Sequence, residues 1–439
     1  MGHPMNDVPP DPGQRAAEIV DLFARGGDGR ANGVHRVMSL VTRNDKGGVI
    51  NTLANLLAIM GNDPPLDGLF GFNEFTAQHL LMRSPPLIED GSLALPGPYP
   101  RPWSAADVSL IQAYIQRVWI GKATRQDVEN SMVACAEHRR FHPVKDWLGS
   151  LKWDRKPRID RWLHVVFGTA DDDYHAAVGS KFLIAAVRRI RHPGVKFDHM
   201  PVLEGDQGIG KSTAIKILFG EQWFSDAIPD ELASKDAAMA LLGIWVLEFA
   251  EIQHLIRNEV EVIKAFLSRS TDRYRPPYGR TYIERPRQGV LIGSTNSTDY
   301  LRDTSGNRRI WPVKCEGADQ DWIRENRDQL WAEAAFRESA GETIWLDDHN
   351  VVKQALAQQS DRMTEDVWTD AIREWLSMRL QVRIPEILNQ VLQIPRERQG
   401  KREEMRIAAI LTAEGWGRRL LRQTAGGKPQ RVWEKAGGT

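Results

Sequence analysis

The stretch that decides the fold is Gly205-Asp206-Gln207-Gly208-Ile209-Gly210-Lys211-Ser212, which meets every position of the pattern G-x-x-x-x-G-K-[ST]. The apolar run Met200 to Leu203 precedes it and predicts a strand, and Thr213 to Leu218 follow it and predict a helix. In this setting the glycines let backbone N–H groups close around phosphates at a helix N-terminus. A chance glycine-rich turn is the weaker alternative, because both flanks fit. The sequence therefore predicts a nucleotide-binding loop.

Two residues at the end of this loop have specific expected roles. Lys211 would reach the β and γ phosphates of ATP, and Ser212 would hold Mg²⁺ through its hydroxyl. The residues expected to contact the nucleotide are Gly205, Asp206, Gln207, Gly208, Ile209, Gly210, Lys211, Ser212 and Thr213.

Two acidic residues follow a second predicted strand, Ile244 to Leu247. Glu248 ends this strand, and Glu251 comes three residues later. An acid at the carboxyl end of a parallel strand lies beside the phosphate-binding loop, so we expect Glu248 to hold the metal and Glu251 to orient or deprotonate the attacking water. The sequence leaves open which acid has which role. The alternative is two surface acids behind a buried strand.

A third predicted strand, Gln288 to Gly293, leads to Asn296, which could hydrogen-bond the γ phosphate or the lytic water as a sensor. Beyond a turn come Arg308 and Arg309. One of them could enter the site of a neighbouring subunit as an arginine finger, which stabilises charge on the γ phosphoryl group. A salt-bridged loop is the alternative, and the sequence does not say which arginine would act.

Basic residues and tyrosines alternate between the second and third predicted strands. Such a segment suits a loop that follows a phosphate backbone and stacks on bases, although a solvated charged face has the same composition. The candidate DNA-binding residues are Lys264, Arg269, Arg273, Tyr274, Arg275, Tyr278 and Arg280.

The composition excludes several classes of protein. The chain has 439 residues and a formal net charge of zero, so any contact with DNA must come from local basic segments. No apolar run approaches the roughly 18 residues that span a bilayer, and the start of the chain is polar and proline-rich, which predicts a cytoplasmic protein without a membrane anchor. Cys135 and Cys315 lack C-x-x-C spacing, which argues against a disulfide framework or a cysteine-rich zinc site.

Changes in pattern along the chain predict five regions. Ser104 and Thr124 are the predicted N-caps of a helical pair in the second region. The regions are a flexible leader (1–35), a mostly helical N-terminal domain (36–145), a helical connecting segment (146–194), a P-loop ATPase core (195–346) and a C-terminal winged-helix-like DNA-binding domain (347–439).

The order of these motifs resembles the virulence-associated protein E (VirE/VapE) family of phages and mobile elements. The ATPase core of that family is of the superfamily 3 helicase type within AAA+. The resemblance extends over roughly residues 50–350. Its motifs are Phe141-His142-Pro143-Val144, Leu151-Lys152-Trp153-Asp154, Pro193-Gly194-Val195-Lys196-Phe197-Asp198, the P-loop, Glu248 to Glu251, Asp272-Arg273-Tyr274-Arg275, Tyr278-Gly279-Arg280, Ser294-Thr295-Asn296, Arg302 to Pro312 and Gln329 to Ala334.

The resemblance implies an α/β P-loop NTPase that forms a homo-oligomeric ring, expected to be a hexamer, and moves on single-stranded DNA with ATP and Mg²⁺. It implies Walker A roles for Lys211 and Ser212, Walker B roles for Glu248 and Glu251, a sensor role for Asn296 and a finger role for Arg308 or Arg309. Residues 264–280 would fall in the segment that supplies the DNA-contacting hairpin. Family members often carry a primase-type domain, for which residues 1–140 show neither an acidic cluster nor zinc-binding cysteines. The chain is therefore expected to be the helicase part alone, and whether a separate primase is a partner stays open.

Two functions fit these patterns. One is an ATP-dependent DNA helicase or translocase used to replicate a phage, prophage or satellite element. The other is a replication initiator or regulator that binds specific double-stranded DNA, such as an origin, through the C-terminal domain. A phosphotransferase for a small molecule fits less well, because it would not need the paired arginines or the basic, tyrosine-containing segment.

Overall fold

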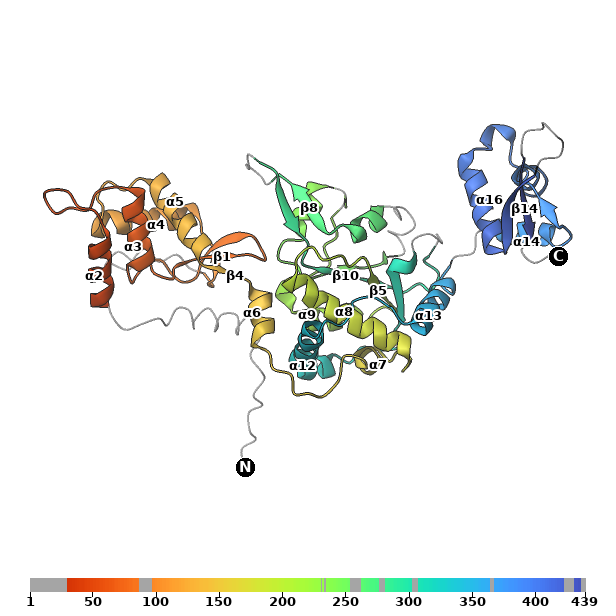
Figure 1. The fold of residues 1–439 in the computed structure, drawn as a ribbon, viewed down its shortest axis with the longest axis horizontal. Coiled ribbons are helices and arrows are strands. Elements are labelled where there is room, and N and C mark those ends of the chain that lie inside the picture. The colour runs from red at the N-terminus through yellow and green to blue at the C-terminus, as the bar shows by residue number, and fades with distance from the viewer. Residues whose placement is uncertain are drawn as a thin grey trace, which may run out of the picture.

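The computed structural model describes residues 30–86, 97–229, 231–232, 234–252, 262–275, 281–301, 307–363, 367–421 and 430–435. These residues form three bodies with separate hydrophobic clusters: an N-terminal body in red to orange, a central body that runs from orange at α6 to light blue at α13, and a C-terminal body in darker blue (Figure 1). Residues 1–29, most of the predicted leader, lie outside the described part, and residues 30–35 already belong to the first described helix.

The N-terminal body packs four helices against a small sheet. Ser104 forms a capping box with Asp107, and Thr124 accepts a hydrogen bond from the Asp127 backbone N–H, so both predicted caps are confirmed. The sheet consists of four short strands in the order β3-β2-β1-β4. The elements are α2 (Arg30–Leu40), α3 (Leu53–Asn62), β1 (Phe70–Asn73), β2 (Gln78–Leu81), β3 (Arg101–Pro102), α4 (Ala105–Val118), α5 (Arg125–His138) and β4 (Arg140–Phe141).

The central body is built on a five-stranded sheet whose strands are all parallel. Its spatial order is β11-β5-β10-β7-β6, so β10 lies between the strand before the P-loop and the strand that carries Glu248. The predicted strands at 200–203, 244–247 and 288–293 correspond to β5, β7 and β10. The strands are β5 (Met200–Glu204), β6 (Phe224–Ser225), β7 (Val246–Phe249), β10 (Val290–Thr295) and β11 (Ile310–Lys314).

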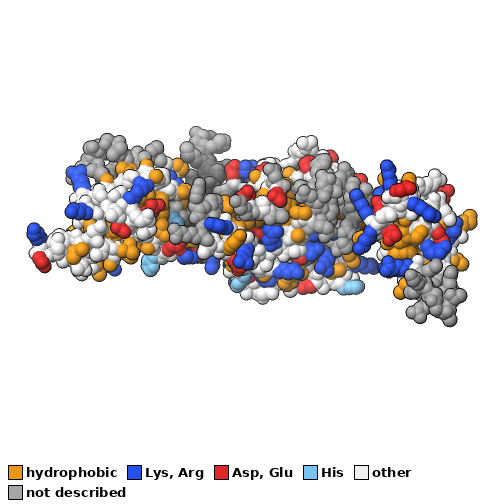
Figure 2. Space-filling view, turned by 90° about the horizontal axis from the view of Figure 1, so that it is seen from above, with side chains coloured by type: hydrophobic (Ala, Val, Ile, Leu, Met, Phe, Trp, Pro, Cys, Tyr) orange, Lys and Arg blue, Asp and Glu red, His pale blue; other side chains and the backbone are white. Residues whose placement is uncertain are grey.

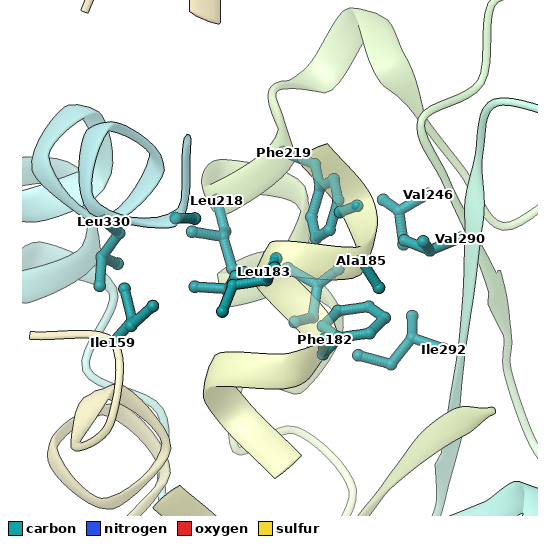
Figure 3. Packing of buried hydrophobic residues seen from close by; sticks show 14 of the residues in the cluster. Ile159, Phe182, Leu183, Ala185, Leu218, Phe219, Val246, Val290, Ile292 and Leu330 are labelled. Atoms are coloured by element: carbon teal, nitrogen blue, oxygen red, sulfur yellow. The ribbon is translucent and has the colours of Figure 1, made fainter. Parts of the chain in front are cut away.

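Alternation along the strands divides the core of the central body between the two faces of the sheet. On β10, Val290 and Ile292 belong to one hydrophobic cluster and Leu291 to the other. Figure 3 shows α8 in the first cluster, with Phe182 beside Ile292 and Leu183 beside Leu218. The helices of this body are α6 (Pro143–Ser150), α7 (Trp162–Phe167), α8 (Asp173–Arg191), α9 (Lys211–Phe219), α10 (Lys235–Ala240), α12 (Gln320–Ser339) and α13 (His349–Ser360), with 3-10 turns η1 (Glu221–Trp223) and η2 (Asn307–Arg309).

The central body is larger than the region 195–346 that the sequence suggests for the ATPase core. Helices α6 to α8, which lie in the predicted connecting segment, contribute Trp147, Trp162 and Phe182 to the same hydrophobic cluster as the sheet. Helix α13, which lies in the predicted C-terminal domain, adds Val351 and Ala355. These helices cover one face of the sheet, so they are part of the same folded unit.

The C-terminal body places three helical segments and a three-stranded antiparallel sheet around one hydrophobic cluster. Its elements are α14 (Thr369–Leu376), β12 (Gln381–Val382), α15 (Ile384–Glu386) continued by the π-helical turn η3 (Ile387–Val391), the 3-10 turn η4 (Arg396–Arg398), α16 (Lys401–Ala413), β13 (Trp416–Leu421) and β14 (Gln430–Lys435).

A buried ion pair ties the end of the P-loop strand to the chain after α13. Arg362 donates two hydrogen bonds of 2.8 Å to the carboxylate of Glu204, which also accepts one of 2.8 Å from the Tyr300 hydroxyl. Glu204 is 2% exposed. The position of the P-loop therefore depends on a charge that is stabilised from another part of the chain.

Arg362→Ala is expected to lower the free energy of unfolding by about 3–5 kcal/mol, because it leaves the buried carboxylate of Glu204 without its counter-charge. Urea denaturation followed by tryptophan fluorescence would measure the change. Arg324→Ala is the matched control, since it removes an exposed arginine whose partner Asp321 is also exposed. An equal shift of the two denaturation midpoints would contradict the structural role assigned to Arg362.

The surface and the helices agree with the composition. Figure 2 shows Lys and Arg side chains interspersed with Asp and Glu on the visible face. Among the helices that the structure describes, none is long and apolar enough to cross a membrane.

Candidate functional site

The loop between β5 and α9 has the backbone conformation that its glycines permit. Gly205, Gly208 and Gly210 have φ values of +156°, +86° and +93°, a region that side chains with a Cβ atom rarely adopt. A Cβ atom on Gly205 would lie 2.6 Å from the carbonyl oxygen of Cys315, so the loop also passes too close to its neighbour for any other residue. The loop leads directly into the N-terminus of α9. Strand, loop and helix thus follow one another as the sequence indicates.

Lys211 is folded back over the loop in this structure. Its ammonium group donates hydrogen bonds of 2.8 Å and 2.9 Å to the backbone carbonyl oxygens of Gly205 and Asp206. The side chain is 9% exposed. Because both partners are loop carbonyls, the ammonium group already lies where the loop would enclose an anion.

A carboxylate and two hydroxyl groups meet beside the loop. Oε1 of Glu248 accepts hydrogen bonds from the hydroxyl of Ser212 at 2.7 Å and from the hydroxyl of Ser294 at 2.6 Å. Glu248 is 1% exposed. The contact with Ser212 brings together two of the predicted site residues, and Ser294 is a partner that sequence reasoning missed. Its position two residues before Asn296 was the available signal.

The second oxygen of Glu248 identifies a place for a cation. Oε2 is buried and has no hydrogen-bond partner in the described structure. A buried carboxylate oxygen without a partner costs free energy, which a bound cation would offset. No group of three or more His, Cys, Asp or Glu side chains that could hold a metal occurs in the ranges that the structure covers. One carboxylate and one hydroxyl suit Mg²⁺, which takes few protein ligands and completes its shell with phosphates and water.

The thiol of Cys315 lies behind the loop and takes no part in this chemistry. Burial raises the pKa of Cys315 to about 12, and the nearby ammonium group of Lys211 only partly opposes that shift. Burial therefore favours the protonated thiol, which is a poor nucleophile.

Glu251 and Asn296 lie at the same edge of the sheet as the loop. Glu251 follows β7 in a left-handed conformation, with φ of 50°, and its side chain is exposed. Asn296 follows β10 and is also exposed. The backbone N–H of Gly205 donates to the carbonyl of Thr295 at 3.1 Å, so the chain at Asn296 runs beside the start of the P-loop. Both residues therefore follow strands that end at the edge of the sheet where the P-loop begins.

Arg308 and Arg309 lie at the opposite end of the sheet. They form η2, directly before β11, and β11 runs parallel to β5 with Ile310 beside Met200. The P-loop begins after Glu204, so the length of β5, roughly 15 Å, separates the arginines from it. Arg309 donates to Asp198 at 3.2 Å, whereas Arg308 is exposed. Neither arginine is placed to reach the P-loop of its own chain.

The basic segment after β7 forms a two-stranded ladder in which β8 (Thr271–Tyr274) pairs with β9 (Ile283–Pro286). Tyr274 is 4% exposed, because alternate residues of β8 face inward, so the stacking role expected for Tyr274 does not fit its position. Tyr282 is 66% exposed, and the guanidinium of Arg273 lies 5.5 Å from the centre of its ring.

The remaining candidate DNA contacts are distributed around this hairpin. Lys264 is half-buried in the helical residues 262–268, Arg269 is half-buried and pairs with Asp272, and Arg275 is exposed. The other two candidates, Tyr278 and Arg280, lie outside the described residues, as does Arg302. Arg273 and Arg275 are therefore the arginines of the hairpin that face solvent in the described part.

The fold and the site define a mixed α/β protein with a parallel sheet and a glycine-rich loop between strand and helix. Residues 148–364 match the model of the virulence-associated protein E-like domain, so this part of the chain is similar to that family.

Two solved structures are similar to this chain at low identity. The apo structure of the NrS-1 C-terminal region (residues 305–718) has 15% identity and a TM-score of 0.40, with 84% of this chain and 96% of that chain covered. An A-form apo structure of the same region has 16% identity and a TM-score of 0.37, with 66% and 78% covered. The comparison with curated proteins finds no match.

Proposed function

We propose that this protein is an ATPase that uses ATP and Mg²⁺ to move along single-stranded DNA, as a superfamily 3-type helicase in the replication of a phage, prophage or satellite element. One observation carries the proposal: Ser212 and Ser294 both donate to Glu248 beside a phosphate-binding loop, and the second oxygen of that carboxylate has no partner in the described structure. A site for Mg²⁺ and ATP needs a phosphate-binding loop, a hydroxyl group at the end of that loop and a carboxylate beside it.

The residues of the chain have separate tasks in this proposal. Backbone N–H groups of the loop bind the phosphates, and Lys211 exchanges the carbonyls of Gly205 and Asp206 for phosphate oxygens. Ser212 and Glu248 would hold Mg²⁺, which neutralises charge that develops on the phosphoryl group. Glu251 orients or deprotonates the attacking water, and Asn296 hydrogen-bonds the γ phosphate or that water.

The position of Arg308 supports assembly into a ring. A strand length separates it from the P-loop of its own chain. An arginine finger at Arg308 can therefore act only on a nucleotide bound by a neighbouring copy, as in an AAA+ ring with ATP sites between subunits. We infer a homo-oligomer, with a hexamer as the expected form, and we assign the finger to Arg308 because Arg309 already pairs with Asp198.

The β8–β9 hairpin supports DNA as the substrate. Arg273 and Arg275 are exposed on it, and Tyr282 offers an exposed ring. Exposed arginines bind phosphates without regard to sequence, and an exposed aromatic ring can stack on any base. A primase, if one is needed, would be a separate partner.

Strand displacement tests the proposal. With ATP and Mg²⁺, the purified protein is expected to release a labelled strand from a forked DNA duplex, and Tyr282→Ala should slow the release because it removes the exposed ring of the hairpin. Phe336→Ala removes an exposed aromatic ring from α12 and should leave the rate unchanged. Release without ATP, or equal rates for the two variants, would count against the proposal.

The second candidate is an ATP-regulated initiator that binds specific double-stranded DNA. The order of elements in the C-terminal body favours it: α14, β12, α15 with η3, α16, β13 and β14 follow the course of a winged helix, in which a helix such as α16 would enter the major groove. Binding of one duplex sequence at least about a thousandfold more tightly than others would support this reading.

A further inference from the structure

A basic cavity lies where the N-terminal body meets the central body. Its volume is about 290 Å³, and Val290 and Gly289 in its wall place it at the start of β10, away from the end that carries the P-loop. The bodies also touch here through a hydrogen bond of 3.0 Å from the backbone N–H of Gly243 to the carbonyl of Phe75. Among the charged residues that line the cavity, the basic ones are Arg140, Lys145, Arg189, Arg191, Arg285 and Arg287, and the acidic ones are Glu74 and Asp272.

Four of the six basic residues already have partners. Arg287 forms a bidentate pair with Asp272, at 2.7 Å and 2.9 Å. Arg189 donates to the carbonyl of Gly289 at 2.7 Å, and burial lowers its pKa to about 10. The two others pair with acids, Arg140 with Glu74 and Glu137 and Arg191 with Glu338. These four shape the wall of the cavity and use their charge within the protein.

The other two basic residues have unused donors. Nε of Arg285 is buried and has no hydrogen-bond partner in the structure as described. Lys145 is exposed on α6, and no ion pair of its ammonium group occurs among the described residues. A buried guanidinium N–H without an acceptor costs free energy, so an acceptor from outside the chain would stabilise it.

Gln288 adds a third donor. Nδ1 of His142 accepts a hydrogen bond from the backbone N–H of Lys145 at 3.2 Å, so its proton is on Nε2, which donates to Oε1 of Gln288 at 2.5 Å. Burial lowers the pKa of His142, which keeps the ring neutral at pH 7. With the oxygen of Gln288 occupied, its NH₂ group remains as a donor. The cavity thus offers donors from a guanidinium, an ammonium and an amide, which suits an anion with several oxygens.

We propose that this cavity binds a phosphodiester group of single-stranded DNA. Arg285 lies on β9 directly across from Asp272 of β8, on the inward face of the hairpin, whereas Arg273 and Tyr282 lie on its outward face. A strand that stacks on Tyr282 would pass its backbone around the edge of this two-stranded hairpin to reach the junction of the two bodies. The inference rests on the proposed function, because it extends the path of the same DNA.

Binding of a fluorescein-labelled oligothymidylate, measured by anisotropy over a range of salt concentrations, tests this site. Arg285→Gln and Lys145→Gln are each expected to weaken binding by about tenfold at low salt. Each should also reduce the slope of log K against log salt by about 0.7, the value for one phosphate contact on a single strand. Arg324→Gln makes the same change of charge on the exposed surface of α12 and should leave affinity and slope as in the unmodified protein.

The outcomes separate this site from its alternatives. Unchanged affinity and slope in a folded Arg285→Gln protein and in Lys145→Gln would overturn the proposal, as would an equal loss in Arg324→Gln. A third outcome has two parts: inorganic phosphate raises the melting temperature of the unmodified protein but not that of Arg285→Gln, and these two proteins bind the oligonucleotide with equal affinity. In that case the cavity binds a small anion, and the DNA assignment is overturned. If Arg285→Gln does not fold, the exposed Lys145 carries the test. Because the titration contains no ATP, its result does not depend on ATP hydrolysis.

Discussion

Replacing Lys211 with alanine is expected to reduce ATP hydrolysis by a factor of about 10² to 10³ or more, because it removes a positive charge from the phosphates in the transition state. The fold should be retained. The ammonium group bonds only to the carbonyls of Gly205 and Asp206 in the loop, so its loss leaves no buried charge behind. Release of phosphate and the melting temperature would be measured on the same preparation.

Lys216→Ala is the matched control for this variant. Lys216 lies on the same helix and forms an exposed pair of 2.7 Å with Glu221. Its loss is expected to leave hydrolysis unchanged. Unfolding of Lys211→Ala, or hydrolysis equal to that of Lys216→Ala, would refute the phosphate-binding role of the loop.

Arg308→Ala is expected to bind ATP normally and to lose hydrolysis by a factor of about 10³ or more in the assembled protein, the usual contribution of an arginine finger. Arg309→Ala should behave differently. It leaves the largely buried carboxylate of Asp198 without its guanidinium partner, at a cost of about 1–3 kcal/mol in stability. Nucleotide binding, hydrolysis and unfolding of the two variants would show which arginine has which role.

Mixing variants tests whether the finger acts between subunits. A ring that contains Lys211→Ala and Arg308→Ala subunits has some sites with an intact P-loop from one chain and an intact Arg308 from its neighbour. We expect the mixture to hydrolyse ATP although neither variant does so alone. An inactive mixture that assembles normally would show that Arg308 does not complete a neighbour's site.

Much of the central sheet could be predicted from the sequence, because three of its strands are short apolar runs. The prediction placed two of them two residues too early: β7 spans Val246–Phe249 and β10 spans Val290–Thr295. Parallel pairing continues through Glu248, which lies beside Ile292, so polar residues at the site are inside the strands and not beyond their ends. Strand β11 was missed because it contains Pro312, which an edge strand tolerates.

The candidate site was only partly predictable, because the sequence does not show which strands lie side by side. The P-loop pattern fixes residue types at fixed spacing, and the structure brings Ser212 to Glu248 and folds Lys211 over the loop. Ser294 was missed because its position two residues before Asn296 does not show that its side chain meets Glu248. That contact depends on the placement of β10 between β5 and β7. The exposed tyrosine of the hairpin is Tyr282 and not the predicted Tyr274. This difference depends on which face of β8 is covered, and composition does not reveal that face.

The most direct test of the central claim is ATP hydrolysis by the purified protein with and without single-stranded DNA, at two salt concentrations and beside Lys211→Ala. The account predicts strong stimulation by DNA that weakens as salt rises, since phosphate contacts release counterions, and almost no hydrolysis by the variant. Hydrolysis that depends on Lys211 but is indifferent to DNA would contradict the translocase and favour the initiator.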